Sequence, residues 1–258
     1  MGAGQPIRNR PCHRTWNRNG CNVLLSRRLL LISSSTRFGS GFLDHCERPI
    51  VDFLGGIQTV LFIPYALHNR DAYAAKVSER FGRMGCTVSA IHTMSDPAGA
   101  VLDAQALFIG GGNTFRLLDC LYHHALIEPI RKRVLQGMPY IGSSAGTNMA
   151  CPTIRTTNDM PIVQPPSFSA LKLVGFNINP HYVNRVAGAK HMGETRDDRI
   201  REFHEENDEP VIGLREGSLL SVSGKEILLL GSEAARVFQK QKEPCDFPVG
   251  SRLDFLEP

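Results

Sequence analysis

Residues 140–149 read YIGSSAGTNM, and this stretch decides how the chain is expected to fold. It places Ser144 between Gly142 and Gly146 in a G-x-S-x-G pattern. A nucleophile elbow needs a buried strand, a sharp turn and a helix in this order, so that the serine hydroxyl stands at the carboxyl end of the strand. The apolar residues before Ser144 and the small residues after it fit that order, and glycine at both flanking positions avoids crowding the turn. The stretch therefore predicts a strand–turn–helix unit in which Ser144 is either a nucleophile or an incidental residue of the turn.

On both sides of this unit the sequence alternates short apolar runs with longer segments of helical pattern. Such alternation is typical of a mostly parallel sheet covered by helices on both faces. The runs that predict strands are LLLIS, TVLFIP, CTVSAIH, QALFIGG, MPYIGS, GFNINP and PVIGL, and the predicted helices span residues 41–54, 71–84, 114–122, 124–136, 145–151 and 194–206. Three later runs, SLLSVSG, EILLLG and ARVFQ, predict short antiparallel strands that finish the same sheet. The expected fold class is a three-layer, doubly wound α/β domain, and no linker divides residues 29–258.

The composition argues against membrane proteins and nucleic-acid-binding proteins. A chain of 258 residues with 42% hydrophobic content can bury the core of one large α/β domain. Its longest apolar runs, such as VLFIP and EILLLG, are too short to cross a bilayer. The net charge is +4, but residues 1–28 contain six arginines and no acid, so the rest of the chain carries a small acidic excess. Because the basic excess is confined to this N-terminal leader, no nucleic-acid partner is expected.

The leader and the cysteines bear on the cellular compartment. Residues 1–28 are arginine-rich and acid-free, as mitochondrial transit peptides are, but their prolines and glycines favour a disordered extension. The seven cysteines contain no C-x-x-C pair, and an odd number cannot all form disulfides within the chain, which favours reduced thiols. The sequence therefore predicts a cytoplasmic protein, or a mitochondrial one if the leader is a transit peptide.

Polar and glycine residues follow three of the predicted strands. In a sheet of this kind, ligands bind beyond the carboxyl ends of the strands. The strand ALFI is followed by the turn GGGNTFRLL, residues 110–118, whose backbone N–H groups could hold an oxyanion or a phosphate. This turn lacks the Lys-Ser/Thr ending of a Walker loop. GFNINP is followed by His181, and PVIGL is followed by Arg215 and Glu216. These residues are expected to meet Ser144 at one edge of the sheet.

His181 is the best candidate for a general base. Of the histidines after Ser144, it alone combines a strand end with a position away from a charged segment. Two acids compete to orient it: Glu216 lies just past a strand end, and Asp159 lies in the long polar loop PTIRTTNDMPIVQPP. Long ordered loops without secondary structure are usually functional, so both acids stay open. No histidine pair has a third ligand at a recognisable spacing, and no metal is expected.

The motifs in their order resemble one family. From about residue 29 to residue 238 the chain resembles the peptidase E family of α-aspartyl dipeptidases. The motifs that carry this resemblance are IGGGNTFRLL, YIGSSAGTNMACPTIRTTNDMPIV, INPHY, GETRDDRIRE and VIGLREGS. The resemblance implies a flavodoxin-like three-layer fold of the kind found in class I glutamine amidotransferases. It also implies a serine peptidase, without metal or other cofactor, that hydrolyses dipeptides with an N-terminal aspartate through an acyl-enzyme. The implied partner is a small peptide, and the oligomeric state stays open.

The resemblance also implies the roles of the catalytic residues. The family nucleophile falls on Ser144 and the family base on His181. A glutamate matching Glu216 is the third triad member, although the aspartate matching Asp159 has also been proposed as essential. One departure lies beside the nucleophile, because Ser143 replaces a tryptophan found in bacterial members. This change is expected to alter the pocket and to leave the triad intact.

Binding roles are carried over in the same way. The family pattern places the amide donors of an oxyanion hole at Gly111, Gly112 and Ala145. It links Arg196, in the GETR segment, to the acidic side chain of the substrate. A fork-shaped guanidinium suits a carboxylate better than lysine does. Arg155 and Arg215 are reserve candidates for this role.

Two other functions stay open for the same residues. One is an amidase or peptidase for β-aspartyl linkages, of the kind that degrades cyanophycin; the GETR and TIRTTNDMP segments favour the α-aspartyl dipeptidase. The other is a non-catalytic module that keeps the glycine-rich pocket for a small ligand, against which the complete set of Ser144, His181 and Glu216 argues. Cys120 and Cys151 are poor alternative nucleophiles, because each lies in or at the end of a predicted helix with no base nearby.

Overall fold

The structure, a computed structural model, describes residues 26–184 and 193–257. Most of the predicted leader, residues 1–25, lies outside the described residues. Within them, no helix is long and apolar enough to cross a membrane.

The last two arginines of the predicted leader belong to the folded part. Arg28 opens strand β1 (Arg28–Ile32), and Arg27 forms an ion pair with Glu257 and a hydrogen bond to the carbonyl of Gly224. The sequence prediction placed Arg27 and Arg28 in the leader because of its arginine content, whereas their contacts fix them to the sheet. The folded part therefore begins before the predicted boundary at residue 29.

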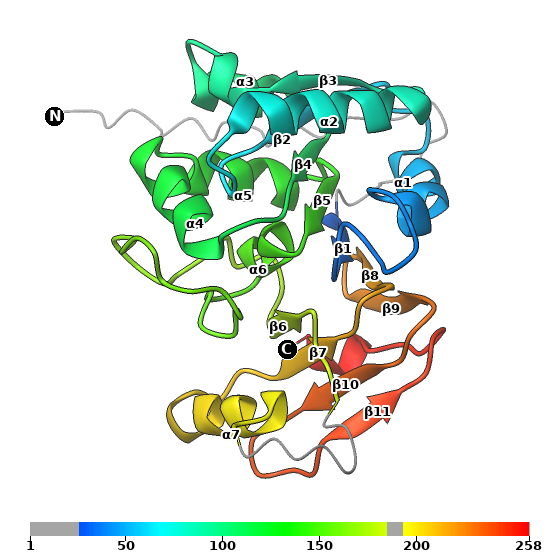
Figure 1. Cartoon of the computed structure of the whole chain (residues 1–258), viewed down its shortest axis with the longest axis vertical. Helices are drawn as coiled ribbons and strands as arrows, with labels where there is room; N and C mark the ends of the chain where they lie inside the picture. Colours follow the sequence, from blue (N-terminus) through cyan, green and yellow to red (C-terminus); the bar gives the residue numbers. More distant parts are fainter. Residues whose placement is uncertain (1–25, 185–192, 258) are drawn as a thin grey trace, which may run out of the picture.

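A seven-stranded sheet forms the centre of the fold (Figure 1). Its strands, in spatial order, are β3 (Thr87–Ala90), β2 (Thr59–Ile63), β4 (Leu107–Ile109), β5 (Tyr140–Ser143), β1, β8 (Ser218–Ser223) and β9 (Glu226–Gly231). The first five are parallel to one another, and β8 and β9 complete the sheet as antiparallel strands. These strands and the antiparallel end of the sheet were predicted, whereas their spatial order was not.

Helices cover both faces of this sheet. They are α1 (Glu47–Leu54), α2 (Arg70–Arg83), α3 (Pro97–Asp103), α4 (Thr114–His123), α5 (Ile127–Leu135) and α6 (Ala145–Ala150), with short 3-10 turns at Asp44–Cys46, Ile91–Thr93 and Asp254–Leu256. Alternate residues of β1 enter two core clusters: Leu29 and Leu31 pack with α3 to α6, and Leu30 and Ile32 pack with α1 and α2. Because successive strand residues point to opposite faces, this division makes three layers. The three-layer fold class is confirmed.

Helix α3 was not predicted, although its signals are present. The Asp96 side chain accepts a hydrogen bond from the backbone N–H of Gly99 at 2.9 Å, and Pro97 occupies the first helical turn. Both are typical of a helix start.

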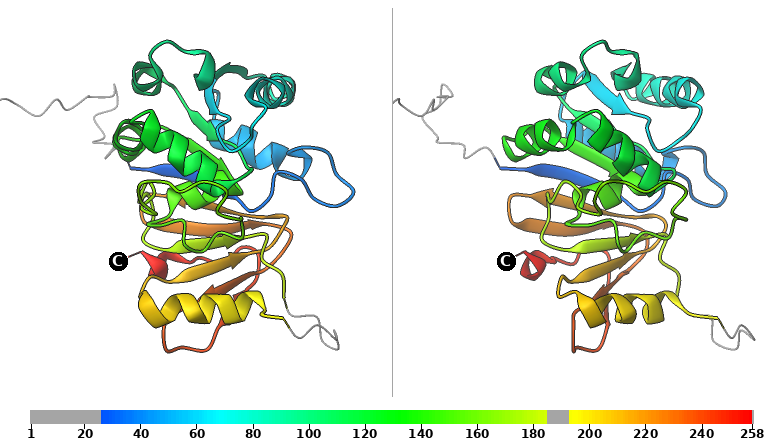
Figure 2. Two further views of the ribbon diagram at one scale, coloured as in Figure 1. Left: turned by 60° about the vertical axis from the view of Figure 1, so that its left-hand side comes forward. Right: turned by 90° about the vertical axis from the view of Figure 1, so that its left-hand side faces the viewer.

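The prediction of one continuous sheet is wrong. Four strands form a second sheet in the order β11-β10-β7-β6. They are β6 (Asn177–Pro180), β7 (Val211–Leu214), β10 (Ala235–Phe238) and β11 (Cys245–Phe247). Helix α7 (Arg196–Glu206) packs against this sheet. Figure 2 shows this sheet beyond the β8–β9 edge of the main sheet. Apolar patterning identifies a strand but not its neighbours, and the long loop before β6 lets the chain leave the main sheet.

The buried hydroxyl of Ser33 joins the two sheets. It follows β1, donates a hydrogen bond to the carbonyl of Leu214 at 2.7 Å, and accepts one from the backbone N–H of His181 at 3.0 Å. The carboxyl ends of β1, β6 and β7 therefore meet at one place, which lies next to the end of β5.

The two glycines around Ser144 are required by close backbone contacts. A Cβ atom on Gly142 would lie 2.5 Å from the carbonyl oxygen of Gly146, and one on Gly146 would overlap the carbonyl oxygen of Ile109 in β4. Ser144 itself has φ of 52° and ψ of −110°, an unusual conformation for a residue with a side chain. Helix α6 thus starts directly against the sheet and forces the turn at the serine.

This contact predicts a large loss of stability for Gly146→Ala. The added methyl group meets backbone, which cannot move without displacing β4, so we expect the free energy of unfolding to fall by about 3 kcal/mol or more. Gly82→Ala is the matched control, since Gly82 lies in α2 with no atom within 4 Å of the place that an added methyl group would occupy, and this change should raise stability by about 0.5–1 kcal/mol. Urea denaturation measures the free energy of unfolding of both variants. Equal stabilities would contradict the close contact between Gly146 and the backbone of β4.

Candidate active site

Three side chains from three strand ends form a connected chain of hydrogen bonds. Ser144 Oγ lies 2.8 Å from His181 Nε2, and His181 Nδ1 lies 2.7 Å from Glu216 Oε1. Ser144 directly follows β5, His181 directly follows β6, and Glu216 is the second residue after β7. The imidazole is partly exposed, with 37% of the His181 side chain and 47% of the Glu216 side chain accessible. A hydroxyl, an imidazole and a carboxylate in this order can activate the hydroxyl as a nucleophile.

The backbone holds His181 in a left-handed conformation, with φ of 53°. Two side chains fix it there: Ser33 accepts its N–H, and the Asn158 amide donates to the carbonyl of the preceding Pro180 at 2.6 Å. Such a conformation costs free energy and persists only where the surroundings impose it. Ser33 was missed by the sequence analysis, because nothing in the pattern SSS after β1 shows which serine faces a distant strand.

Asp159 lies near the site but contacts another group. Its Oδ2 accepts hydrogen bonds from the backbone N–H of Thr114 at 2.7 Å and from the Thr114 hydroxyl at 2.5 Å, at the start of α4. Helix N-termini favour such carboxylates. Of the two acids left open by the sequence, Glu216 therefore contacts the imidazole, and Asp159 is held over the glycine turn.

The loop that carries Asp159 is tied to β6 by its polar residues. The Thr156 hydroxyl donates to the carbonyl of Ile178 at 2.8 Å, and the Asn179 amide donates to the carbonyl of Thr156 and to Asn158 Oδ1, both at 2.8 Å. The segment TIRTTND, which looked too polar for regular structure, is therefore built into the base of the site.

The glycine turn before α4 lies against Ser144. A Cβ atom on Gly111 would be 3.0 Å from Ser144 Cβ and 3.6 Å from Ser144 Oγ, so only glycine leaves this approach open. Gly112 has φ of 137°, and a Cβ atom there would lie 2.6 Å from the carbonyl oxygen of Ala66. Ala145 is the first residue of α6, where backbone N–H groups have no partner within the helix. Gly111 and Ala145 thus lie beside Ser144, and Gly112 lines the same pocket; their role as amide donors stays a prediction.

The Tyr73 hydroxyl, from α2, lies behind this turn. It sits where a side chain on Gly110 would be and next to the N–H of Gly111. Burial raises the pKa of Tyr73, and the N–H of Gly111 partly opposes that shift. The phenol therefore stays protonated and can both accept and donate a hydrogen bond.

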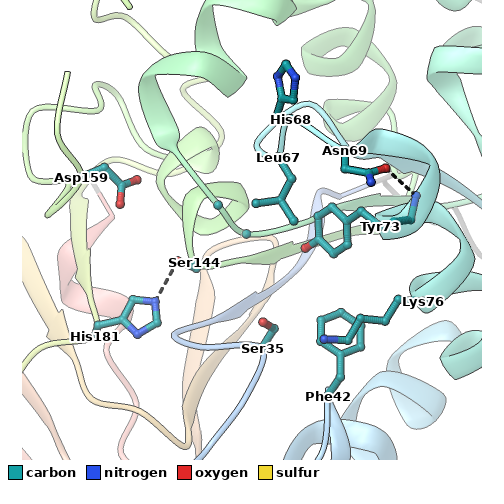
Figure 3. Close-up of a pocket in the computed structure, with 13 residues that line it drawn as sticks. Ser35, Phe42, Leu67, His68, Asn69, Tyr73, Lys76, Ser144, Asp159 and His181 are labelled. Atoms are coloured by element: carbon teal, nitrogen blue, oxygen red, sulfur yellow. Dashed lines mark hydrogen bonds between the residues drawn. The ribbon is translucent and has the colours of Figure 1, made fainter. Parts of the chain in front are cut away.

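A pocket of about 760 Å³ opens over Ser144 (Figure 3). Its lining comes from Ser35 and Phe42 after β1, from the start of α2 including Tyr73 and Lys76, from Gly111 and Gly112, and from Ser144, Asp159 and His181. The cavity thus extends from the Ser144–His181 pair toward α2 and is large enough for a dipeptide.

Cysteine nucleophiles are disfavoured by burial. Cys151 is completely buried, and this raises the pKa of its thiol to about 12. Burial also raises the pKa of Cys120. The reactive form of a cysteine is the thiolate, which these pKa values suppress near neutral pH. Among the described residues, no group of three or more His, Cys, Asp or Glu side chains is arranged to hold a metal ion.

Comparison with known proteins identifies the family. Residues 29–230 match the sequence profile of "Peptidase family S51". The chain belongs to this family. Peptidase E of Streptomyces coelicolor is 50% identical to the S51 chain over 228 residues, which make up 88% of the chain and 94% of that relative. A "Probable alpha-aspartyl dipeptidase" of Drosophila melanogaster is 50% identical over 234 residues, 90% of the chain and 98% of the relative.

A solved structure shares the fold. A putative peptidase E protein from Listeria monocytogenes matches 80% of this S51 chain and 99% of its own, with a TM-score of 0.61 and 24% identity. The resemblance to the peptidase E family and the α/β fold that it implied are confirmed.

The predicted arginines lie elsewhere in this S51 chain. Arg196, the first residue of α7, is half-buried. Burial lowers the pKa of its guanidinium, and the nearby charge of Arg199 adds a smaller shift in the same direction. It is not among the described residues that line the pocket, and its predicted role stays a prediction. The two reserve candidates bind other groups: Arg215 contacts Asp246, and Arg155 contacts Asn207.

Proposed function

We propose that this chain is a serine peptidase that cleaves dipeptides with an N-terminal aspartate. The observation that carries the proposal is the hydrogen-bonded series of Ser144, His181 and Glu216 beside a glycine turn. Membership of family S51 and relatives named Peptidase E and probable alpha-aspartyl dipeptidase support the substrate class.

In the proposed first half-reaction, Ser144 Oγ attacks the carbonyl carbon of the aspartyl residue. His181 Nε2 accepts the hydroxyl proton, while Glu216 accepts the Nδ1–H of the ring and stabilises the imidazolium that forms. Backbone N–H groups of the glycine turn and of Ala145 donate to the oxyanion of the tetrahedral intermediate. His181 then returns the proton to the departing amine, the C–N bond breaks, and an aspartyl ester on Ser144 remains.

The second half-reaction uses the same groups with water as the nucleophile. His181 accepts a proton from the water as it attacks the ester carbonyl, and the same N–H groups hold the second oxyanion. Return of the proton to Ser144 Oγ breaks the ester and releases aspartate. No metal or cofactor is part of the proposal.

Asp159 is proposed to hold the ammonium group of the substrate. It lines the pocket that contains Ser144, and its Oδ2 is already fixed by Thr114. A carboxylate locked in this way pairs with a cation at little further cost in side-chain entropy.

Assays on purified protein with Asp-Leu, Asn-Leu, Glu-Leu and isoaspartyl-Leu test the proposal. We expect the highest kcat/KM for Asp-Leu and loss of activity after treatment with a serine-reactive phosphonate. Iodoacetamide, which alkylates accessible thiolates, is the control and should leave activity unchanged. Preference for the isoaspartyl peptide would favour the β-aspartyl alternative, and binding without cleavage or labelling would favour the non-catalytic module.

The cytoplasm is the compartment that we propose. The described cysteines Cys46, Cys86, Cys120, Cys151 and Cys245 are all free thiols, as expected in a reducing compartment. Fluorescence imaging of the full chain with a C-terminal tag tests this. A mitochondrial signal that disappears when residues 1–25 are removed would favour a transit peptide instead.

A further inference from the structure

Lys76 lines the active-site pocket, and it is the one lysine or arginine among the described residues that do so. It lies on α2, three residues after Tyr73, and both side chains line the pocket that contains Ser144. Residues three apart on a helix share a face, so the Tyr73 phenol and the Lys76 ammonium point toward the same cavity. Figure 3 shows Lys76 and His181 on opposite sides of Ser144.

The Lys76 ammonium is held by an aromatic ring and not by an acid. Its Nζ lies 4.5 Å from the centre of the Phe42 ring. The Phe42 ring packs edge-on against the Tyr73 ring, with 6.3 Å between the two ring centres. Glu79 is the only acid three or four residues away on the same helix, and it forms an ion pair with Arg83. Within the described residues, Lys76 therefore has no salt-bridge partner, and its charge is available to a ligand.

The chemistry of the substrate supplies that ligand. Among the described residues, one carboxylate, that of Asp159, and one lysine, Lys76, line the pocket, and they lie on different sides of the nucleophile (Figure 3). A zwitterionic dipeptide with an acidic first residue carries one ammonium group and two carboxylates. With the ammonium group at Asp159, a carboxylate is the group that Lys76 can bind.

We propose that Lys76 binds a carboxylate of the dipeptide and so selects the substrate, an inference that rests on the proposed function. The departing amine must lie beside His181, which gives it a proton. The acyl residue therefore extends away from His181, on the side where Lys76 lies. The β-carboxylate of the aspartyl residue is the expected partner, and the C-terminal carboxylate of the leaving residue is the second source of the same chemistry.

Lys76→Met tests the inference with three substrates that differ by one carboxylate: Asp-Leu, Asn-Leu and Asp-leucinamide. We expect kcat/KM for Asp-Leu to fall about 30- to 300-fold, as for an ion pair that loses one partner. Asn-Leu should lose less than threefold, and Asp-leucinamide should lose as much as Asp-Leu. A loss that spares Asp-leucinamide but not Asn-Leu would support the same role with the C-terminal carboxylate as the partner.

Three further variants separate recognition from other effects. Lys76→Arg keeps the charge and should restore most of the activity on Asp-Leu. Lys132→Met removes an exposed lysine of α5, on the opposite face of the sheet, and should change none of the three rates. Arg196→Met tests the rival assignment, in which Arg196 binds the acidic side chain of the substrate. If Arg196→Met lowers that ratio and Lys76→Met does not, Arg196 is the specificity residue and the inference is wrong.

The inference and the proposed function fail in different ways. Equal losses on all three substrates, or no loss on any, would contradict a carboxylate contact at Lys76 while leaving the dipeptidase intact. Wild-type protein that cleaves none of the three would contradict the proposed function. Thermal melting of each variant should match the wild type, because Lys76 is exposed at the pocket wall.

Discussion

Ser144→Ala is expected to lower kcat on an aspartyl dipeptide by about four to six orders of magnitude, because the triad acts as a unit once its nucleophile is missing. The serine hydroxyl is the group that His181 contacts at 2.8 Å, and no other hydroxyl of the described residues lies at hydrogen-bond distance from the imidazole Nε2. Steady-state hydrolysis of Asp-Leu, followed by release of leucine, measures the effect.

The fold of this variant should persist. Alanine differs from serine by one oxygen atom, and the contacts that force the turn are made by the backbone of Gly142 and Gly146. Circular dichroism and thermal melting should therefore match the wild type. A folded Ser144→Ala protein that keeps more than a tenth of the activity would disprove the serine mechanism.

The position of the nucleophile could be predicted because its geometry is local. Strand, turn and helix follow one another within residues 140–151, and the glycines that the turn needs are visible in the sequence. His181 and Glu216 could be predicted for a related reason, since each follows an apolar run and strand ends gather catalytic residues. The structure brings all three within hydrogen-bonding distance.

The partners of these residues could not be predicted, because they depend on which strands are neighbours. His181 and Glu216 come from a second sheet whose separation from the first has no signal in the apolar pattern. Ser33 joins the two sheets through bonds that span more than 140 residues. Lys76 lies on a correctly predicted helix, yet its face toward the pocket depends on how α2 packs beside β2.

The family resemblance covered what local patterns could not, but unevenly. It named Glu216 as the third member of the triad, and Glu216 is the acid that contacts the imidazole. It also named Arg196 as the partner of the acidic side chain; Arg196 is not among the described residues that line the pocket, and this role stays a prediction. A carried-over residue is most secure where local chemistry requires it, as at Ser144, and least secure where only a charge is needed.

Glu216→Gln is expected to have the second largest effect, lowering kcat by about 10²- to 10⁴-fold with little change in KM. Glu216 Oε1 accepts the Nδ1–H of His181, which leaves Nε2 free to take the proton of Ser144. A neutral amide cannot stabilise the imidazolium, and its NH₂ group can favour the tautomer in which Nε2 already carries a proton. The partial exposure of this pair places the expected loss below that of Ser144→Ala, because water screens the carboxylate.

Asp159→Asn provides the comparison that decides between the two acids. Its carboxylate bonds Thr114 and not the imidazole, so we expect a higher KM for Asp-Leu and a kcat within about tenfold of the wild type. Asparagine keeps an oxygen that can accept the Thr114 N–H, so the loop should stay in place and the change should report the lost charge. A larger loss of kcat for Asp159→Asn than for Glu216→Gln would exchange the two roles. It would mean that the Asp159 carboxylate, and not the Glu216 carboxylate at the imidazole, acts in the transition state.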